Sequence, residues 1–192
     1  MVATGDGGWV GHNTDGAGMV ASFREVIDPN GIEVLIVGAG GAAFAIAVEL
    51  ALAGAATIHV AGRSPDRAAA LARLVETGTE ARASTMPLTE PLAVPDGAGL
   101  VINATPVGMT PEVDAAITVD WATAGPDTVV GDVVFNPATT TFLRAAADAG
   151  ATTVDGTGML VNQAAENVRL WTGILPDRAP LRAALEQALG LG

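Results

Sequence analysis

The sequence predicts an α/β protein of the Rossmann type, with a doubly wound parallel sheet and helices on both faces. The first observation is a glycine-rich turn, residues 38–43, which follows the apolar run Val34–Val37 and opens a helical segment. The second is that strand-like and helix-like segments alternate along the chain. The third is that the strand-like runs are continuously apolar, which is typical of a parallel sheet covered on both faces.

The expected elements follow one another in a regular order. A helix over 14–27 comes first, and the Asn13-Thr14-Asp15 turn is expected to cap it. Strands are predicted at 34–37, 57–61, 81–85, 100–103, 128–132 and 152–155. Helices are predicted after the glycine turn and at 65–75, 140–149, 158–171 and 181–189. The predicted domains are a linker strand and helix (1–30), a dinucleotide-binding domain (31–157) and C-terminal helices that pack back toward the substrate side (158–192).

Composition narrows the classes of protein to consider. The chain has 192 residues, of which 49% are hydrophobic, so it can bury a substantial core. Its net charge of −12 disfavours nucleic acid and anionic membranes as partners. It contains no cysteine and two histidines, which rules out disulfides and disfavours a zinc site. We expect a cytoplasmic protein that binds no metal.

The stretch 34–61 is long and almost uncharged, with Glu49 as its one ionised residue. Its length raises the alternative of a membrane helix. The glycines at 38–41 and at Gly54 divide it into strand, helix and strand, so we predict no membrane segment.

The glycine turn has the layout that binds the pyrophosphate of a dinucleotide. Gly38 permits the tight turn, Gly40 lets the backbone approach the phosphates, and Ala43 allows the helix to pack closely on the strand. The helix N-terminus then directs free N–H groups and a positive partial charge at the anion. We expect the cofactor to contact Gly38, Gly40, Gly41 and Ala42.

Two arginines after the second strand indicate which dinucleotide is bound. Folds that bind NAD carry an acidic residue about 20 residues after the glycines. That position here holds Arg63, with Ser64 beside it and Arg67 one helical turn later. Two guanidinium groups on one face suit the 2′-phosphate of NADP, which they can bind bidentately. The alternative is a solvent-facing pair at a helix start, with Asp66 as a competing partner.

Three later segments end strands at the edge where open α/β sheets bind ligands. The loop 103–109 contains Thr105 and Pro106, and we expect it to lie along the nicotinamide half of the cofactor. The alternative is an ordinary turn at the end of a strand, which has a similar sequence pattern. The segments 132–137 and 155–163 end the next two strands in the same layer.

Two single side chains and one turn have plain structural alternatives. Gln163 can offer a donor and an acceptor to a polyol, whereas a lone glutamine is more often solvated. The turn 11–16, taken alone, is a helix cap. His59 lies inside the second strand and is expected to be structural.

Taken together and in order, these segments resemble the shikimate dehydrogenase family. The matching pieces cover nearly the whole chain and are 13–16, 38–42, 62–64 with Arg67, 103–106, 132–137, 156–164 and 171–173. The resemblance implies reduction of 3-dehydroshikimate to shikimate with NADPH, in the biosynthesis of aromatic amino acids. The implied ligands are NADP(H) and a small hydroxylated cyclohexene carboxylate.

The resemblance also implies roles for single residues. Asp15 matches the family's catalytic aspartate, which would hydrogen-bond the reacting hydroxyl and assist a lysine in proton transfer. Asn13 and Thr14 would shape the substrate pocket, and Gln163 would hold a substrate hydroxyl. The nicotinamide site would be lined by Val133, Gly156 and Met159.

This chain departs from the family pattern in three ways. All nine basic residues are arginine, so Asp15 has no lysine partner, and we expect the N-terminal domain that supplies it to be missing. Phe135 stands where the family often has tyrosine, which removes a hydroxyl contact with substrate. Gly62 replaces a frequent asparagine beside the 2′-phosphate. We therefore expect the chain to hold NADP and to be inactive alone.

Other hypotheses stay open. The chain can be a non-catalytic dinucleotide-binding or interaction module that pairs with a separate chain carrying the substrate half. It can instead belong to a quinate or aminoshikimate dehydrogenase, or to an enzyme that uses NAD. We also expect the helix 14–27 and the last helices to expose an apolar face that favours a homodimer.

Overall fold

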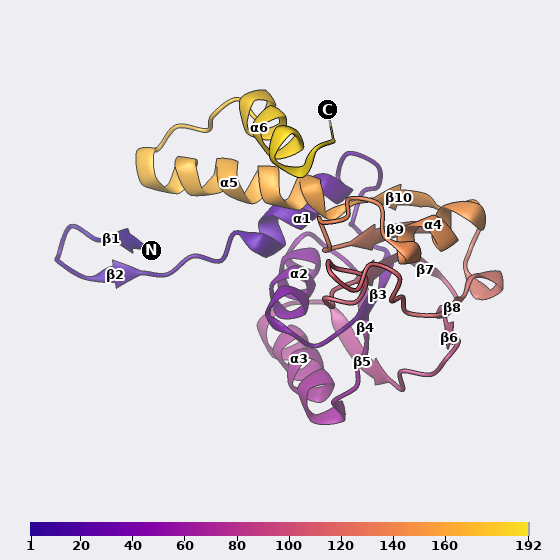
Figure 1. Cartoon of the computed structure of the whole chain (residues 1–192). Coiled ribbons are helices and arrows are strands. Elements are labelled where there is room, and N and C mark those ends of the chain that lie inside the picture. Colours follow the sequence, from indigo (N-terminus) through magenta and orange to yellow (C-terminus); the bar gives the residue numbers. More distant parts are fainter. Residues whose placement is uncertain (192) are drawn as a thin grey trace.

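The main sheet has six parallel strands in the order β10-β9-β7-β3-β4-β5 (Figure 1). We describe residues 1–191 from a computed structural model. The chain enters the sheet at its middle, moves outward on one side, and then crosses to build the other side. This is the strand order of a Rossmann dinucleotide fold, with its switch point between the third and fourth positions. The strands are β3 (Glu33–Val37), β4 (Thr57–Ala61), β5 (Arg82–Met86), β7 (Ala98–Asn103), β9 (Val129–Asp132) and β10 (Thr152–Val154).

The carboxyl ends of four central strands lie in register at one edge of the sheet. Val37 at the end of β3 pairs with Ala61 of β4 and with Asn103 of β7, and Asn103 pairs with Asp132 of β9. Ligands of open α/β sheets bind at this edge, beside the switch point. The topology therefore brings the glycine turn, the arginine segment and the later loops to one place.

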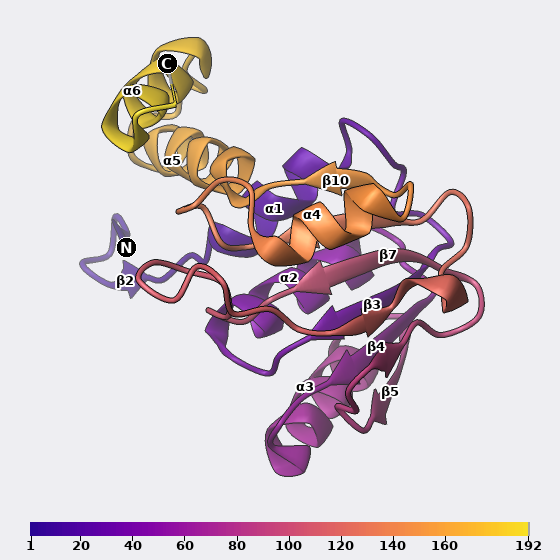
Figure 2. The same ribbon diagram turned by 45° about the vertical axis from the view of Figure 1, so that its right-hand side comes forward.

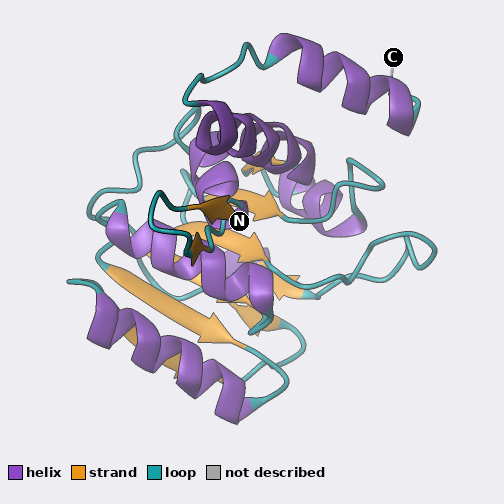
Figure 3. Ribbon diagram, turned by 90° about the vertical axis from the view of Figure 1, so that its left-hand side faces the viewer, coloured by secondary structure: helices purple, strands orange, loops and turns teal. Residues whose placement is uncertain are grey.

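Helices cover both faces of the sheet (Figures 2 and 3). Val34 and Ile36 of β3 belong to the core on one face, and Leu35 belongs to the core on the other. Because alternate residues of β3 serve two cores, the strand is apolar throughout. The first face is covered by α1 (Asp15–Phe23), α2 (Gly41–Leu52) and α3 (Pro65–Gly78). The second is covered by α4 (Thr141–Asp148), the 3-10 turn η1 (Trp121–Thr123) and a small parallel sheet of β6 (Leu92–Ala93) and β8 (Val119–Asp120).

Helix α5 (Gly156–Thr172) packs on α1, with α6 (Ala179–Leu189) beyond it. The buried amide Nδ2 of Asn162 donates to the Gly18 carbonyl at 3.2 Å and to Ser22 Oγ at 3.0 Å. Glycine is needed for this approach, because a Cβ at position 18 would lie 2.7 Å from the Met159 carbonyl oxygen. The hairpin of β1 (Val2–Ala3) and β2 (Trp9–Val10) projects from the body beside the N-terminus (Figure 1).

The structure confirms the predicted fold class and all six predicted strands, and it corrects two details at α1. The helix ends at Phe23 rather than residue 27. Its apolar residues Met19, Val20 and Phe23 are buried, so the expectation that α1 exposes an apolar face is wrong. The exposed large apolar side chains near the chain ends include Trp9, Trp171, Ile174 and Leu175. No helix among residues 1–191 combines the length and apolar character that a membrane span requires.

Candidate functional site

The glycine turn between β3 and α2 is fixed by its neighbours on both sides. The Gly38 N–H donates to the Ala61 carbonyl at 2.7 Å, and the Ala104 N–H donates to the Val37 carbonyl at 2.8 Å. Gly38 has a φ of 118°, and a Cβ there would lie 2.8 Å from the Ala104 carbonyl oxygen. Only glycine satisfies both the conformation and the contact, so the turn is built for this close approach.

The start of α2 is open and uncapped. A Cβ added at Gly40 or Gly41 would meet no protein atom within 4 Å. Gly40 is the N-cap residue and offers no side-chain acceptor, so the first N–H groups of α2 have no side-chain cap. Ala43 is fully buried against the sheet, whereas Ala42 is half-buried. Free N–H groups, a helix dipole and clear space fit the pyrophosphate of a dinucleotide.

The arginine segment follows β4 at the same edge. Arg63 and Arg67 are exposed, and Ser64 is the N-cap residue of α3 with no side-chain capping bond. The ion pairs among residues 1–191 are His59–Glu33 and Arg169–Glu166. Asp66, the alternative partner considered for the two arginines, therefore pairs with neither of them. Both guanidinium groups are therefore available to an anion such as a 2′-phosphate.

Asn103 holds the loop after β7, in which Thr105 is half-buried and Pro106 is exposed. Its Oδ1 accepts from the Thr105 N–H at 3.0 Å and from Thr105 Oγ1 at 2.7 Å. Its Nδ2 donates to the Val107 carbonyl at 3.2 Å and to Asp132 Oδ1 at 3.0 Å. A single buried amide thus determines the conformation of the loop expected beside the nicotinamide.

Asp132 at the end of β9 is fully buried and accepts three hydrogen bonds. Besides Asn103, its Oδ1 accepts from the Val134 N–H at 2.9 Å, and its Oδ2 accepts from Thr140 Oγ1 at 2.7 Å. Burial raises the pKa of the Asp132 carboxyl from 3.8 to about 6, and the hydrogen bonds oppose that rise. The segment 132–137 was singled out in the sequence, but the burial of this carboxylate was not foreseen.

The residues expected around the nicotinamide meet at one corner of the site. The Val133 N–H donates to the Asn103 carbonyl at 3.0 Å, which joins the ends of β7 and β9. A Cβ at Gly156 would lie 2.6 Å from the carbonyl oxygens of Val133 and Val134. The Met159 side chain is buried in the core that Val133 also contacts. Val133 and Gly156 are therefore adjacent, and Met159 belongs to the core cluster against which Val133 packs.

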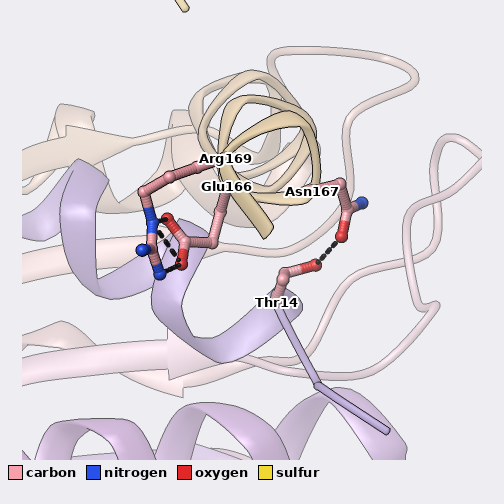
Figure 4. Close-up of polar contacts among 4 residues, drawn as sticks. All are labelled: Thr14, Glu166, Asn167 and Arg169. Atoms are coloured by element: carbon pink, nitrogen blue, oxygen red, sulfur yellow. Dashed lines mark hydrogen bonds and ion pairs between the residues drawn. The ribbon is translucent and has the colours of Figure 1, made fainter. Parts of the chain in front are cut away.

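Thr14, one of the residues expected to contact substrate, lies at the start of α1 and faces Asn167 of α5 (Figure 4). Thr14 is buried and donates from Oγ1 to Asn167 Oδ1 at 3.1 Å, while Asn167 Nδ2 donates to Gln163 Oε1 at 3.2 Å. Asn13 is exposed, and its Oδ1 caps the Asp15 N–H at 3.0 Å, so Asn13 rather than Thr14 supplies the side-chain cap. The Asp15 carboxylate is exposed on the first turn of α1.

Asn167 was missed by reasoning from the sequence alone. It lies one turn after Gln163 on α5, and that spacing was the one available signal. The Gln163 Oε1 atom accepts from Asn167 Nδ2 and lies 3.5 Å from Thr14 Oγ1, so this oxygen faces the α1–α5 contact. The Gln163 amide nitrogen makes no hydrogen bond within residues 1–191, so it can donate to a ligand. A pocket of ≈ 240 Å³ lies on the α2 side, lined by Asn13, Phe44, Ala45, Val48 and Glu49.

His59 is structural, as expected. Its ring joins three strands, with Nε2 3.0 Å from Glu33 Oε2 and Nδ1 2.9 Å from Ser84 Oγ. These partners lie on β3 and β5 and away from the carboxyl edge of the sheet.

Two family models match the chain. One, described as shikimate / quinate 5-dehydrogenase, matches residues 23–108. The other, described as the shikimate 5'-dehydrogenase C-terminal domain, matches residues 156–186. Together they include the glycine turn, the arginine segment, the loop after β7 and the Gln163 helix.

Three known proteins illustrate the similarity. The shikimate dehydrogenase (NADP(+)) of Desulforamulus reducens is 36% identical over 198 residues, covering 100% of this chain and 67% of that protein. The ligand-free 5-ketofructose reductase of a Gluconobacter strain is 44% identical with a TM-score of 0.90, covering 95% and 66% of the two chains. The quinate dehydrogenase of Corynebacterium glutamicum in complex with NAD is 35% identical with a TM-score of 0.83, covering 97% and 66%. The chain spans 62 to 67% of the length of the first two curated relatives it matches.

Proposed function

We propose that the chain, which belongs to the shikimate dehydrogenase family, is the NADP-binding part of an oxidoreductase that reduces 3-dehydroshikimate to shikimate. The observation that carries the proposal is the open, uncapped start of α2 with two unpaired arginines among the described residues at the same sheet edge. These groups suit the pyrophosphate and the 2′-phosphate of one dinucleotide. The relative from Desulforamulus reducens carries NADP(+) in its name.

The bound NADPH would supply the hydride, and this chain's residues would orient the substrate. The exposed Asp15 carboxylate can accept a hydrogen bond from the reacting hydroxyl and orient a proton carrier. Gln163, with its oxygen facing Asn167 and Thr14, would donate to a substrate oxygen from its amide nitrogen. The 192 residues include no lysine, so the family's proton carrier must come from outside this chain. We therefore propose negligible turnover by the chain alone.

A second candidate is reduction of a sugar ketone. The chain is 44% identical to 5-ketofructose reductase, against 42% and 36% to the shikimate dehydrogenases of Methanopyrus kandleri and Desulforamulus reducens. Phe135, which replaces the family's frequent tyrosine, favours this alternative because the tyrosine hydroxyl would contact shikimate. Both candidates need a dinucleotide at the glycine turn and a hydrogen bond from the Gln163 amide nitrogen to a substrate oxygen. They differ in the rest of the substrate.

Catalysis is tested by adding the missing proton carrier. The purified chain is assayed with NADP⁺ and shikimate, alone and mixed with a separately expressed lysine-bearing substrate domain from a family member. We expect no measurable NADPH formation alone and measurable formation with the added domain. Turnover by the chain alone would contradict the proposal of inactivity, and 5-ketofructose reduction without shikimate oxidation would favour the second candidate. We propose that the partner of this chain is either a second copy of it, in a homodimer, or a separate chain that carries the substrate domain.

A further inference from the structure

The buried carboxylate of Asp132 has no part in the chemistry proposed above, yet it lies at the centre of the site. It is fully buried at the carboxyl end of β9 and accepts from the side chains of Asn103 and Thr140 and from the Val134 N–H. Each partner belongs to a segment at the ligand-binding edge. The carboxylate therefore connects the loop after β7 with the loop between β9 and α4.

The hydrogen bonds continue from each partner into its own segment. Asn103 fixes Thr105 and Val107 through three further hydrogen bonds. Thr140 accepts from the Leu143 N–H at 3.1 Å and so caps α4. One carboxylate thus determines the separation of two loops and the start of a helix.

Both loops belong to the second half of the sheet. In a Rossmann fold each half holds one mononucleotide, and the glycine turn and arginines lie in the half built from β3, β4 and β5. The half built from β7, β9 and β10 faces the nicotinamide. The arginine segment makes none of these hydrogen bonds, so a group that acts through the loops of the second half should leave the adenosine end of the ligand nearly unaffected.

The arrangement requires a carboxylate rather than an amide. Three donors converge on the two oxygens of Asp132, so both oxygens must accept. An asparagine would direct an N–H group at one of these donors and break the network. Burying a charge is costly, and a core position that only needed packing would favour an apolar residue.

We propose that Asp132 is a positioning residue for the nicotinamide end of the bound dinucleotide. Its carboxylate touches neither cofactor nor substrate and instead holds the loops 103–109 and 132–140 in the geometry that the nicotinamide requires. This inference rests on the proposed function, because it needs a dinucleotide at the glycine turn. It assigns Asp132 a role that is separate from those of Asp15 and Gln163.

Paired ligands test the inference on the chain itself. NADPH carries both halves of the cofactor, whereas adenosine 2′,5′-bisphosphate carries only the half at the arginines. For Asp132→Asn we expect NADPH to bind about tenfold more weakly and the bisphosphate to change less than twofold. Asp148→Asn removes an exposed carboxylate from the end of α4 and should change neither affinity.

A second pair of variants separates positioning from folding. Thr140→Val removes the donor to Asp132 and should likewise weaken the binding of NADPH but not that of the bisphosphate. Thr140→Ser keeps the hydroxyl and should bind both ligands like the natural chain. Equal weakening of both ligands, or no weakening of NADPH, would overturn the inference while leaving the proposed function intact. If the natural chain bound neither ligand, the proposed function would fail and this inference with it.

Discussion

Asn103 donates from Nδ2 to Asp132 Oδ1 over 3.0 Å, and the two residues are 29 positions apart in the chain. They pair at the carboxyl ends of β7 and β9, next to the point where the sheet reverses its order. The bond lies beneath the loops that follow β7 and β9 at the carboxyl edge of the sheet. This amide–carboxylate pair therefore links the interior of the sheet to the geometry of the site.

Asp132 makes the stability of the protein depend on pH in a defined direction. Burial raises its folded pKa to about 6, against 3.8 for an ordinary aspartate. Between these values the folded protein holds a proton that the unfolded chain has released, so this contribution to stability is lost as pH rises toward 6. From pH 4.5 to 7.5 the unfolding free energy should fall by about 2 kcal/mol more in the natural chain than in Asp132→Asn. Urea unfolding across this range measures it, and parallel curves would disprove the effect.

The glycine turn offers two substitutions with opposite consequences. Gly38→Ala forces a φ of 118° on alanine and sets its Cβ 2.8 Å from the Ala104 carbonyl oxygen, so it should destabilise the fold by about 2 kcal/mol or more. Gly40→Ala has clear space around its Cβ, so its stability should change by less than about 1 kcal/mol. Its methyl group occupies the space proposed for the phosphates, so NADPH should bind poorly. Thermal unfolding and NADPH titration test both, and unchanged NADPH binding by Gly40→Ala would contradict the assignment.

The hydrogen bond between Thr14 and Asn167 should stabilise the contact of α1 with α5. A double-mutant cycle with Thr14→Val and Asn167→Ala should give a coupling of about 1 kcal/mol in urea unfolding, because Thr14 is buried. The matched control is the Glu166–Arg169 pair on the same helix (Figure 4), which lies at the surface and should couple by about 0.4 kcal/mol or less. Equal couplings for the two pairs would show that burial does not strengthen the Thr14 bond.

Much of the fold could be predicted because its signals are local. The central strand β3 is a run of apolar residues after Glu33, and the glycine turn marks the first change from strand to helix. The ends of the helices and strands were harder to predict. For example, α5 begins at Gly156, two residues before the predicted start at 158. Strands of two residues, such as β6 and β8, carry no pattern that a sequence can reveal.

The features that were missed depend on contacts between distant parts of the chain. α1 has an apolar face against the sheet, but its burial is completed by α5, whose Asn162 bonds to Ser22 140 residues earlier. Asn167 looks like any polar residue of a surface helix until α5 is placed on Thr14. Likewise, the raised pKa of Asp132 follows from complete burial, which periodicity does not report.

The central claim, that this chain binds NADP through its arginine segment, is tested most directly by comparing cofactors. Dissociation constants for NADPH and NADH are measured by titration of the natural chain, Arg63→Ala and the control Arg73→Ala. The control removes an exposed arginine from the middle of α3. We expect Arg63→Ala to weaken NADPH about tenfold or more and NADH less than about twofold, with no change in the control. Equal losses for NADPH and NADH in Arg63→Ala would contradict the assignment of the 2′-phosphate to this residue.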